Sequence, residues 1–263
     1  MFWKKSIFGV PPSSFDLSHV SPLNHAFAHN DSVYNSPLFD SLQFGFQFIE
    51  ADVHLINDDI YVYHKRPIFL NKNKTLTNCY LQPLFNLIEK KGTVFSQSNH
   101  TLYLILDIKT DAVKTYEKLK LILNPFNSIL THWKNGVIKN NAVTIVLSGN
   151  RPVEMVFQEQ ERWVAIDGRI EDIEKNYDAQ FMPMVSDKYS KVFGFSIFSK
   201  KPSVEKLKRL LEISKSIQKQ GKLFRLWGIP ERRTIWESLL KNGLDLISTD
   251  RIKELNDFIR SNK

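Results

Sequence analysis

Two acidic side chains stand two residues apart in a stretch that is typical of a buried β-strand. Glu50 and Asp52 lie in FQFIEADVHLI, where most other residues are apolar. Residues two apart on a strand project to the same side, so the two carboxylates lie together. Like charges in apolar surroundings repel each other and lose hydration. They therefore require a bound cation or a shared proton.

Three more residues extend this pair into a possible catalytic centre. Asp107 ends the apolar stretch TLYLILD and supplies a third carboxylate, and three oxygen donors suit Mg²⁺ or Ca²⁺. His29 ends HAFAH and His64 ends IYVYH, and two imidazoles beside a metal suit a general base and a general acid. The pattern predicts one divalent cation and an acid/base pair. Each residue taken alone is also compatible with a helix cap, a salt bridge or a hydrogen-bonded structural histidine.

Four other residues are candidates for substrate binding. Lys109 lies two residues after Asp107 and points the same way, so it can bind a phosphate oxygen or pair with Asp107. Asn30 follows the first histidine and can orient it. Trp227 can line the substrate pocket or pack in the hydrophobic core. Arg151 is a candidate phosphate ligand, with a structural role as the alternative.

The elements that position these residues alternate between short apolar strands and helices. About eight such steps predict an α/β protein with a parallel sheet covered by helices, and the length fits a (β/α)8 TIM barrel. In this fold the C-terminal ends of the strands share one face, where active sites form. The residues predicted at or near those ends are His29, Glu50, Asp52, Asp107, Lys109, Ser148, Asp167 and Trp227. No G-x-G-x-x-G or P-loop follows a strand, which disfavours a nucleotide site.

The domain organisation is predicted from the residues that interrupt helices and strands and from the length of the chain. Residues 1–22 are rich in Pro and Ser and predict an irregular lead-in, and residues 23–263 predict a single barrel domain. The single cysteine, Cys79, excludes an internal disulfide and a Cys-rich metal site. No signal-peptide apolar region and no membrane-length apolar run are seen. We expect a soluble protein, cytoplasmic by default, and the oligomeric state stays open.

The net charge favours anionic partners. It is +8, with a pI near 9.4, so phosphates or an anionic membrane surface are plausible, and a merely basic surface is the alternative. The Lys and Arg residues of the C-terminal third are spaced like the solvated face of an amphipathic helix. Nucleic acid is therefore not expected as a partner.

Several motifs resemble one superfamily over roughly residues 23–252. AHND, IEADVH, VYHKRP, LILDIK and GLDLISTD resemble the barrel of the glycerophosphodiester phosphodiesterase and phosphatidylinositol phospholipase C-like superfamily. SGNRPVEMV and AIDGRIED are similar to its "altered inheritance of mitochondria" phosphodiesterase-like branch. The resemblance implies a TIM barrel with one divalent ion and a histidine acid/base pair. The implied ion ligands and catalytic residues are Glu50, Asp52, Asp107, His29 and His64.

Two details refine the implied substrate. The Asp107-x-Lys109 pattern is similar to the sphingomyelinase D-type branch, in which that lysine contacts the phosphate. Glycerophosphodiesterases usually carry His-Arg-Gly where this chain has His29-Asn30-Asp31, so glycerophosphodiester specificity is not implied. The leading hypothesis is a metal-dependent phosphodiesterase, hydrolytic or cyclising, for a small phosphodiester or a phospholipid headgroup. The alternative is a non-catalytic barrel that binds a phospho-ligand.

Overall fold

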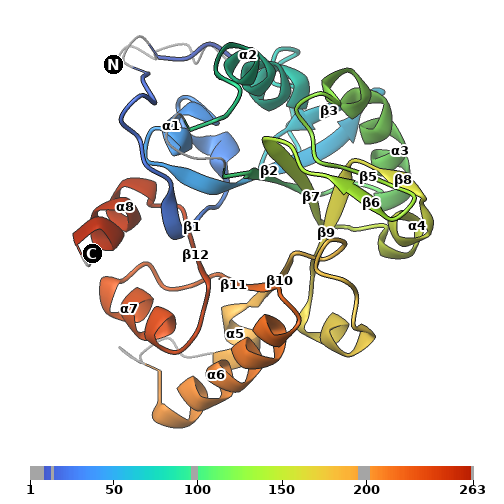
Figure 1. Cartoon of the computed structure of the whole chain (residues 1–263). Coiled ribbons are helices and arrows are strands. Elements are labelled where there is room, and N and C mark those ends of the chain that lie inside the picture. Colours follow the sequence, from blue (N-terminus) through green and yellow to red (C-terminus); the bar gives the residue numbers. More distant parts are fainter. Residues whose placement is uncertain (1–8, 13–14, 96–99, 195–201, 262–263) are drawn as a thin grey trace. The chain divides into compact units, whose positions relative to one another are not determined.

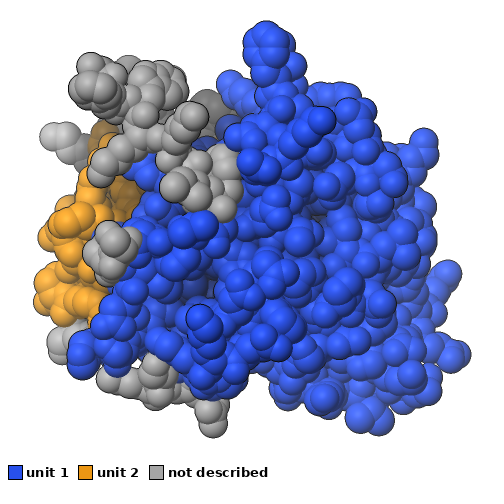
Figure 2. Space-filling view, turned by 90° about the horizontal axis from the view of Figure 1, so that it is seen from above, with its two compact units in different colours: residues 1–22, 29–164 blue, residues 23–28, 165–263 orange. Residues whose placement is uncertain are grey.

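The computed structural model describes residues 9–12, 15–95, 100–194 and 202–261 (Figure 1). Contacts divide the chain into two compact units, coloured separately in Figure 2. Unit 1 comprises residues 1–22 and 29–164, and unit 2 comprises residues 23–28 and 165–263. The described part of the lead-in forms neither helix nor strand. The single domain over residues 23–263 stays a prediction.

Unit 1 is built on three parallel strands with a fourth, antiparallel strand at one edge. The order is β3-β2-β4-β7. These are the apolar runs seen in the sequence, and they are buried on both faces, as parallel strands usually are. Helix α3 packs beside β2 and β3 (Figure 1). The strands are β2 (Phe46–Ile56), β3 (Asp59–Val62), β4 (Leu102–Ile108) and β7 (Val143–Gly149).

The helices of unit 1 follow local start and stop signals. Helix α2 is followed by Gly92, whose φ of +75° closes the helix in the left-handed region. Asp111 is the N-cap of helix α3, and its side chain accepts a hydrogen bond from the Lys114 backbone N–H. The helical segments are η1 (Asp31–Val33), α1 (Phe39–Leu42), the π-helical η2 (Thr77–Leu81), α2 (Gln82–Lys91), α3 (Ala112–Leu123), η3 (Asn124–Phe126) and α4 (Val153–Gln158).

A small antiparallel sheet in unit 1 was not predicted from the sequence. Its strands are β5 (His132–Lys134), β6 (Val137–Lys139) and β8 (Glu161–Arg162), in the order β6-β5-β8. Asn135 and Gly136 form the turn, both with positive φ, which is the Asn-Gly hairpin signal. The Arg162 guanidinium lies over the Trp133 ring at 4.1 Å from its centroid. The strands are too short for alternation to reveal them.

Unit 2 holds a run of parallel strands in the order β1-β12-β11-β10-β9. Its strands are β1 (Leu23–Ala28), β9 (Val164–Gly168), β10 (Met184–Lys188), β11 (Leu223–Trp227) and β12 (Leu246–Thr249). Its helical segments are η4 (Ile170–Lys175), α5 (Tyr189–Phe193), α6 (Val204–Lys219), α7 (Arg233–Lys241) and α8 (Ile252–Ser261). Residues 195–201, between α5 and α6, lie outside the described residues.

The fold class is the (β/α)8 TIM barrel that the sequence predicts. Eight parallel strands, β1, β2, β4, β7, β9, β10, β11 and β12, alternate with helical segments along the chain. Among the described residues, no helix combines the length and apolarity needed to cross a bilayer.

Candidate metal and catalytic site

Neighbouring strands of unit 1 bring the three predicted carboxylates together. Asp52 on β2 and Asp107 on β4 are register partners, and Ser148 on β7 is the partner of Asp107 in turn. Glu50 lies two residues before Asp52 and therefore projects from the same side of β2. One carboxylate oxygen from each of Glu50, Asp52 and Asp107 lies within 4.8 Å of the others. Asp52 is completely buried and Glu50 is 2% exposed, so their charges have little access to water.

Each predicted imidazole lies against a different carboxylate of this cluster. His29 follows β1, and its Nε2 is 3.7 Å from Glu50 Oε1. His64 follows β3, and its Nδ1 is 3.1 Å from Asp52 Oδ2. Because a carboxylate only accepts hydrogen bonds, His64 Nδ1 donates to Asp52, and Nε2 is the ring atom left for exchanging a proton. The structure therefore brings all five predicted metal-binding and catalytic residues into one place.

The Asn30 side chain is hydrogen-bonded to the His29 ring. Its Nδ2 donates to His29 Nδ1 at 3.0 Å, which fixes the orientation of the ring. The backbone of Asn30 is left-handed, with φ of 51° and ψ of 37°, a conformation that Asn tolerates better than most residues. Asn30 thus has a positioning contact that the sequence suggested, while its role in substrate binding stays a prediction.

A buried carboxylate, Asp31, holds the loop that carries His29. It accepts hydrogen bonds from the Leu38 N–H at 2.6 Å, from the Tyr80 hydroxyl at 2.7 Å and from the Ser41 hydroxyl. Burial raises the pKa of Asp31 from 3.8 to about 6, although these three hydrogen bonds oppose the shift. From the sequence, Asp31 is expected to follow His29 and orient it, like Asn30. Nothing in the sequence pairs it with Tyr80, which is far along the chain.

The raised pKa of Asp31 predicts a pH dependence of stability. The folded state holds this proton more tightly than the unfolded state, so the contribution is largest in acid and is lost as pH rises to about 6. From pH 4.5 to 7.5 the free energy of unfolding should fall by about 2 kcal/mol relative to Asp31→Asn, which does not titrate. Urea unfolding of both proteins across this range measures the difference. Parallel pH profiles would contradict the assignment.

Lys109 bridges two of the carboxylates. Its Nζ is 2.7 Å from Asp52 Oδ1 and 2.7 Å from Asp107 Oδ2. Burial opposes the charge of Lys109, but Asp107 and Asp52 outweigh that effect and raise its pKa. The ion pair that the sequence left open as an alternative is present. A contact with a substrate phosphate stays a prediction.

His54 joins β2 to the segment that carries His64. Its Nε2 donates to the Tyr63 carbonyl at 3.0 Å, and burial lowers its pKa, which keeps the ring neutral near pH 7. Tyr63 immediately precedes His64 in the chain. His54 therefore positions the second imidazole through the backbone.

Gly149 is a site residue that sequence reasoning missed. It ends β7 with φ of +67°, and a Cβ built there would lie 2.0 Å from Asp107 Oδ1 and 2.5 Å from the Ile108 carbonyl. A side chain at this position is incompatible with the observed place of the Asp107 carboxylate. The sequence shows only a glycine at a strand end, which is typical of an ordinary turn. Its closeness to Asp107 depends on the pairing of β4 with β7.

The residues present fit a hard divalent cation. Three carboxylates converge, and buried Asp52 directs Oδ1 at an ammonium group, which shows that this point requires positive charge. Carboxylate oxygens are the donors that Mg²⁺ and Ca²⁺ prefer, with water and substrate completing the shell. Glu50, Asp52 and Asp107 can therefore hold such an ion.

The remaining predicted residues lie at other strand ends. Arg151 follows Gly149 in unit 1, and its role in phosphate binding stays a prediction. Trp227 ends β11 in unit 2, where the Lys188 ammonium lies 5.5 Å from its ring centroid. Asp167, predicted near a strand end, lies on β9 and is completely buried, and its Oδ2 forms an ion pair with Arg169 Nη1 at 2.9 Å.

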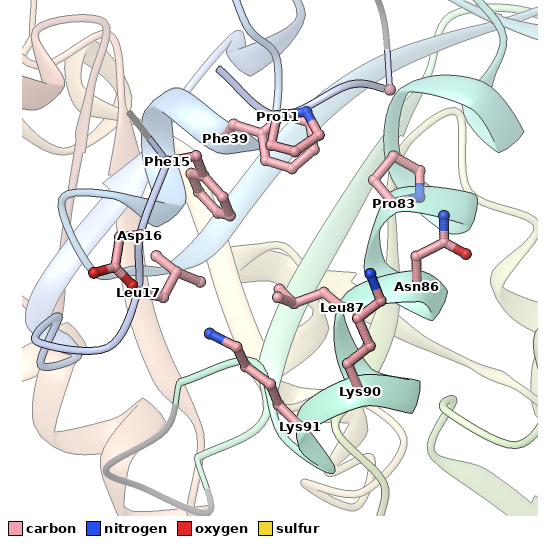
Figure 3. Close-up of a pocket in the computed structure, with 11 residues that line it drawn as sticks. Pro11, Phe15, Asp16, Leu17, Phe39, Pro83, Asn86, Leu87, Lys90 and Lys91 are labelled. Atoms are coloured by element: carbon pink, nitrogen blue, oxygen red, sulfur yellow. The ribbon is translucent and has the colours of Figure 1, made fainter. Parts of the chain in front are cut away.

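A separate pocket lies in unit 1 between the lead-in and α2. Its volume is about 310 Å³, and its lining comes from the lead-in, α1 and α2. Figure 3 shows Phe15 and Leu17 facing Leu87, with Lys90 and Lys91 on α2. None of the carboxylates or imidazoles of the candidate site lines it. We therefore do not assign the chemistry to this pocket.

Comparison with known proteins identifies the family. The AIM6-like phosphodiesterase domain matches residues 16–167, more than half of the chain, including both imidazoles and all three carboxylates. The chain belongs to the AIM6-like phosphodiesterase domain family. This AIM6-like chain is 26% identical over 254 residues to the altered inheritance of mitochondria protein 6 homolog of Arthroderma benhamiae, covering 86% of this chain and 80% of that protein. It is also 26% identical to altered inheritance of mitochondria protein 6 of Lachancea thermotolerans, covering 90% and 66%.

Solved structures share the fold of the AIM6-like chain. A calcium-dependent phosphoinositol-specific phospholipase C from Pseudomonas matches with a TM-score of 0.56 at 15% identity, covering 90% of this chain and 93% of that one. A glycerophosphodiester phosphodiesterase from Parabacteroides distasonis matches with a TM-score of 0.53 at 12% identity, covering 92% and 99%. These identities show the common fold alone. The family match confirms the phosphodiesterase-like branch that the motifs suggested, and the solved structures agree with its barrel fold.

Proposed function

We propose that the chain is a divalent-metal-dependent phosphodiesterase that acts on a glycerophosphodiester or a phospholipid-type substrate. The observation that carries the proposal is the convergence of three carboxylates with an imidazole against two of them. Membership of a phosphodiesterase domain family supports the same reaction class.

The proposed metal ligands are Glu50, Asp52 and Asp107. A bound Mg²⁺ or Ca²⁺ would offset the negative charge of the non-bridging phosphate oxygens. The calcium dependence named for the Pseudomonas phospholipase is a reason to test Ca²⁺ beside Mg²⁺. Lys109 must release at least one carboxylate to make room for the ion, and its freed ammonium can then bind a phosphate oxygen.

The two imidazoles supply the proton transfers. One of His29 and His64 accepts the proton of the attacking hydroxyl or water while a new P–O bond forms. The other donates a proton to the leaving alkoxide as the second P–O bond breaks. Asn30 and Asp52 hold the two rings in place at their Nδ1 atoms. Water as nucleophile gives hydrolysis, and a neighbouring substrate hydroxyl gives a cyclic product.

A second candidate is a non-catalytic barrel that binds a phospho-ligand. The bridging contact of Lys109 favours it, because an ammonium already balances Asp52 and Asp107. Such a protein would bind phosphorylated ligands and turn none over.

Assays with a panel of phosphodiesters, with and without a chelator, separate the two candidates. We expect product release that depends on Mg²⁺ or Ca²⁺ and that falls by at least 100-fold in His29→Ala. Phosphorus NMR of the product distinguishes a cyclic from an open phosphate. His25→Ala is the control, because its Nδ1 bonds to the Asp245 carbonyl within unit 2 and the proposal assigns it no proton transfer.

The alternative gives a different pattern of results. Wild-type protein that binds a phosphodiester without turnover, and still binds it after His29→Ala, would support the ligand-binding barrel. Turnover unaffected by a chelator would contradict the proposed metal dependence.

A further inference from the structure

A loop that follows His64 carries two highly exposed apolar side chains at its tip. We name residues 65–72 the tip loop. Ile68 is 92% exposed and Phe69 is 90% exposed. They are adjacent in the chain and are the two most exposed large hydrophobic residues in the described part of the protein. Single exposed apolar residues are common, but two such large neighbours at one tip mark an interaction site.

The base of the tip loop is fixed, so the tip is presented on an ordered support. The Val62 N–H donates to the Lys74 carbonyl at 3.0 Å, and the Asn71 N–H donates to the Tyr63 hydroxyl at 3.0 Å. The Lys74 ammonium lies 4.7 Å from the Tyr63 ring centroid and donates to the Ser32 carbonyl at 3.0 Å. These contacts hold the two ends of the tip loop together, and Ile68 and Phe69 between them are exposed to solvent.

The charged residues of the tip loop and of the sequence on either side of it are all basic. Lys65, Arg66 and Lys72 are exposed on both sides of the apolar pair. No Asp or Glu occurs in the sequence from residue 60 to residue 88. An apolar tip with a basic collar matches the interface of an anionic bilayer, where acyl chains lie beneath negatively charged headgroups.

We propose that the tip loop docks the protein on an anionic lipid membrane. Ile68 and Phe69 enter the boundary between headgroups and acyl chains, and Lys65, Arg66 and Lys72 contact lipid phosphates. The membrane supplies both an apolar layer for the tip and negative charge for the collar.

The size of the patch favours a bilayer over a protein partner. Two side chains of this kind expose on the order of 300 Å². A stable protein interface needs about 800 Å² from each partner, with a well-packed centre. A bilayer requires no shape complementarity, so a small apolar tip supported by basic residues is sufficient.

The tip loop begins at the residue after His64, which gives docking a consequence for the proposed function. A docked loop brings His64 close to lipid headgroups. This consequence rests on the phosphodiesterase proposal, whereas the docking itself does not.

Vesicle flotation of the full chain with a chelator present tests docking without turnover. Vesicles of phosphatidylcholine alone are compared with vesicles of equal parts phosphatidylcholine and phosphatidylserine. We expect binding to the anionic vesicles and about a 100-fold loss of affinity in the double variant Ile68→Ser, Phe69→Ser. The matched control is Val113→Ser, Leu121→Ser, which removes two exposed apolar side chains from α3 and should bind like wild type.

A second measurement reports insertion directly. Cys79 is the single cysteine, and burial raises its pKa to about 12, so it resists thiol labelling. A polarity-sensitive dye on Phe69→Cys should shift to the blue on anionic vesicles, and the same dye on Leu121→Cys should not. Lys65→Gln, Arg66→Gln, Lys72→Gln should bind both kinds of vesicle equally.

Three outcomes would overturn the proposal. Wild type could fail to bind anionic vesicles, or the Ile68/Phe69 double variant could bind as well as its α3 control. Alternatively, light scattering could show an oligomer that the double variant abolishes, which would assign the tip to a contact between copies of the chain. Turnover of a soluble phosphodiester is measured separately, so failure of docking and failure of the phosphodiesterase proposal are distinguishable.

Discussion

Replacing Asp52 with Asn is expected to lower phosphodiester cleavage by about 10⁴-fold, the upper end of the range for a group that supports proton transfer. Asp52 is completely buried and contacts His64 Nδ1 at 3.1 Å and Lys109 Nζ at 2.7 Å. The change removes a charge from the proposed metal site. It also replaces one of the two acceptor oxygens with an NH2 donor, so His64 and Lys109 can no longer both be paired, and one substitution affects both parts of the site.

Asp58→Asn is the matched control for this prediction. Asp58 lies in the turn after β2, its side chain is 90% exposed, and it pairs with Lys118 at the surface. It should leave turnover and metal binding unchanged, because exposed ion pairs contribute little.

A double-mutant cycle gives a sharper result for Asp52. If Asp52 acts partly through His64, the combination of Asp52→Asn with His64→Ala costs much less than the sum of the single effects. Kinetics of the four proteins under saturating metal measure this coupling. Additive losses, or an Asp52→Asn protein with normal turnover, would contradict the role given to Asp52.

Gly149→Ala is expected to lower activity by about 10³-fold and divalent-metal affinity by at least 10-fold. Mutation of residues that only support metal ligands typically lowers metal affinity or activity by 10- to 100-fold, and this change displaces a proposed ligand itself. The added methyl would lie 2.0 Å from Asp107 Oδ1 and would force that carboxylate out of the cluster. Calorimetric titration with Ca²⁺ and Mg²⁺ measures the loss of affinity.

Gly136→Ala separates this steric effect from backbone strain. Gly136 has φ of +78°, similar to the +67° of Gly149, but a Cβ there meets nothing within 4 Å. It should lose only about 1 kcal/mol of stability and keep normal metal binding. Equal metal affinity in the two variants would show that Gly149 is not needed to place Asp107.

The sequence predicts most of this architecture because its signals are local. The run Phe46–Ile56 forms β2 with the bounds that its apolar pattern indicates, and α2 is closed by a glycine, the common C-terminal signal of a helix. The barrel ties the strand ends to one face, so the proximity of Glu50, Asp52 and Asp107 could be predicted without coordinates.

Other features depend on contacts between distant parts of the chain. Asp31 receives hydrogen bonds from Ser41 and Tyr80, and neither spacing forms a recognisable motif. The importance of Gly149 arises from a neighbouring strand, and the small sheet around Trp133 has strands too short to show a period. In each case tertiary packing, rather than local preference, sets the outcome.

If the proposed metal site is correct, the bridge formed by Lys109 would make folding less dependent on a bound metal ion. A site with three unbalanced carboxylates would resist folding until an ion arrived, because buried like charges are costly. Here a tethered ammonium balances two of them from the start. The ammonium therefore offsets part of this cost without an ion, and the cation of the proposed function would have to displace it. Metal binding would then depend on the concentration of free cation around the folded protein.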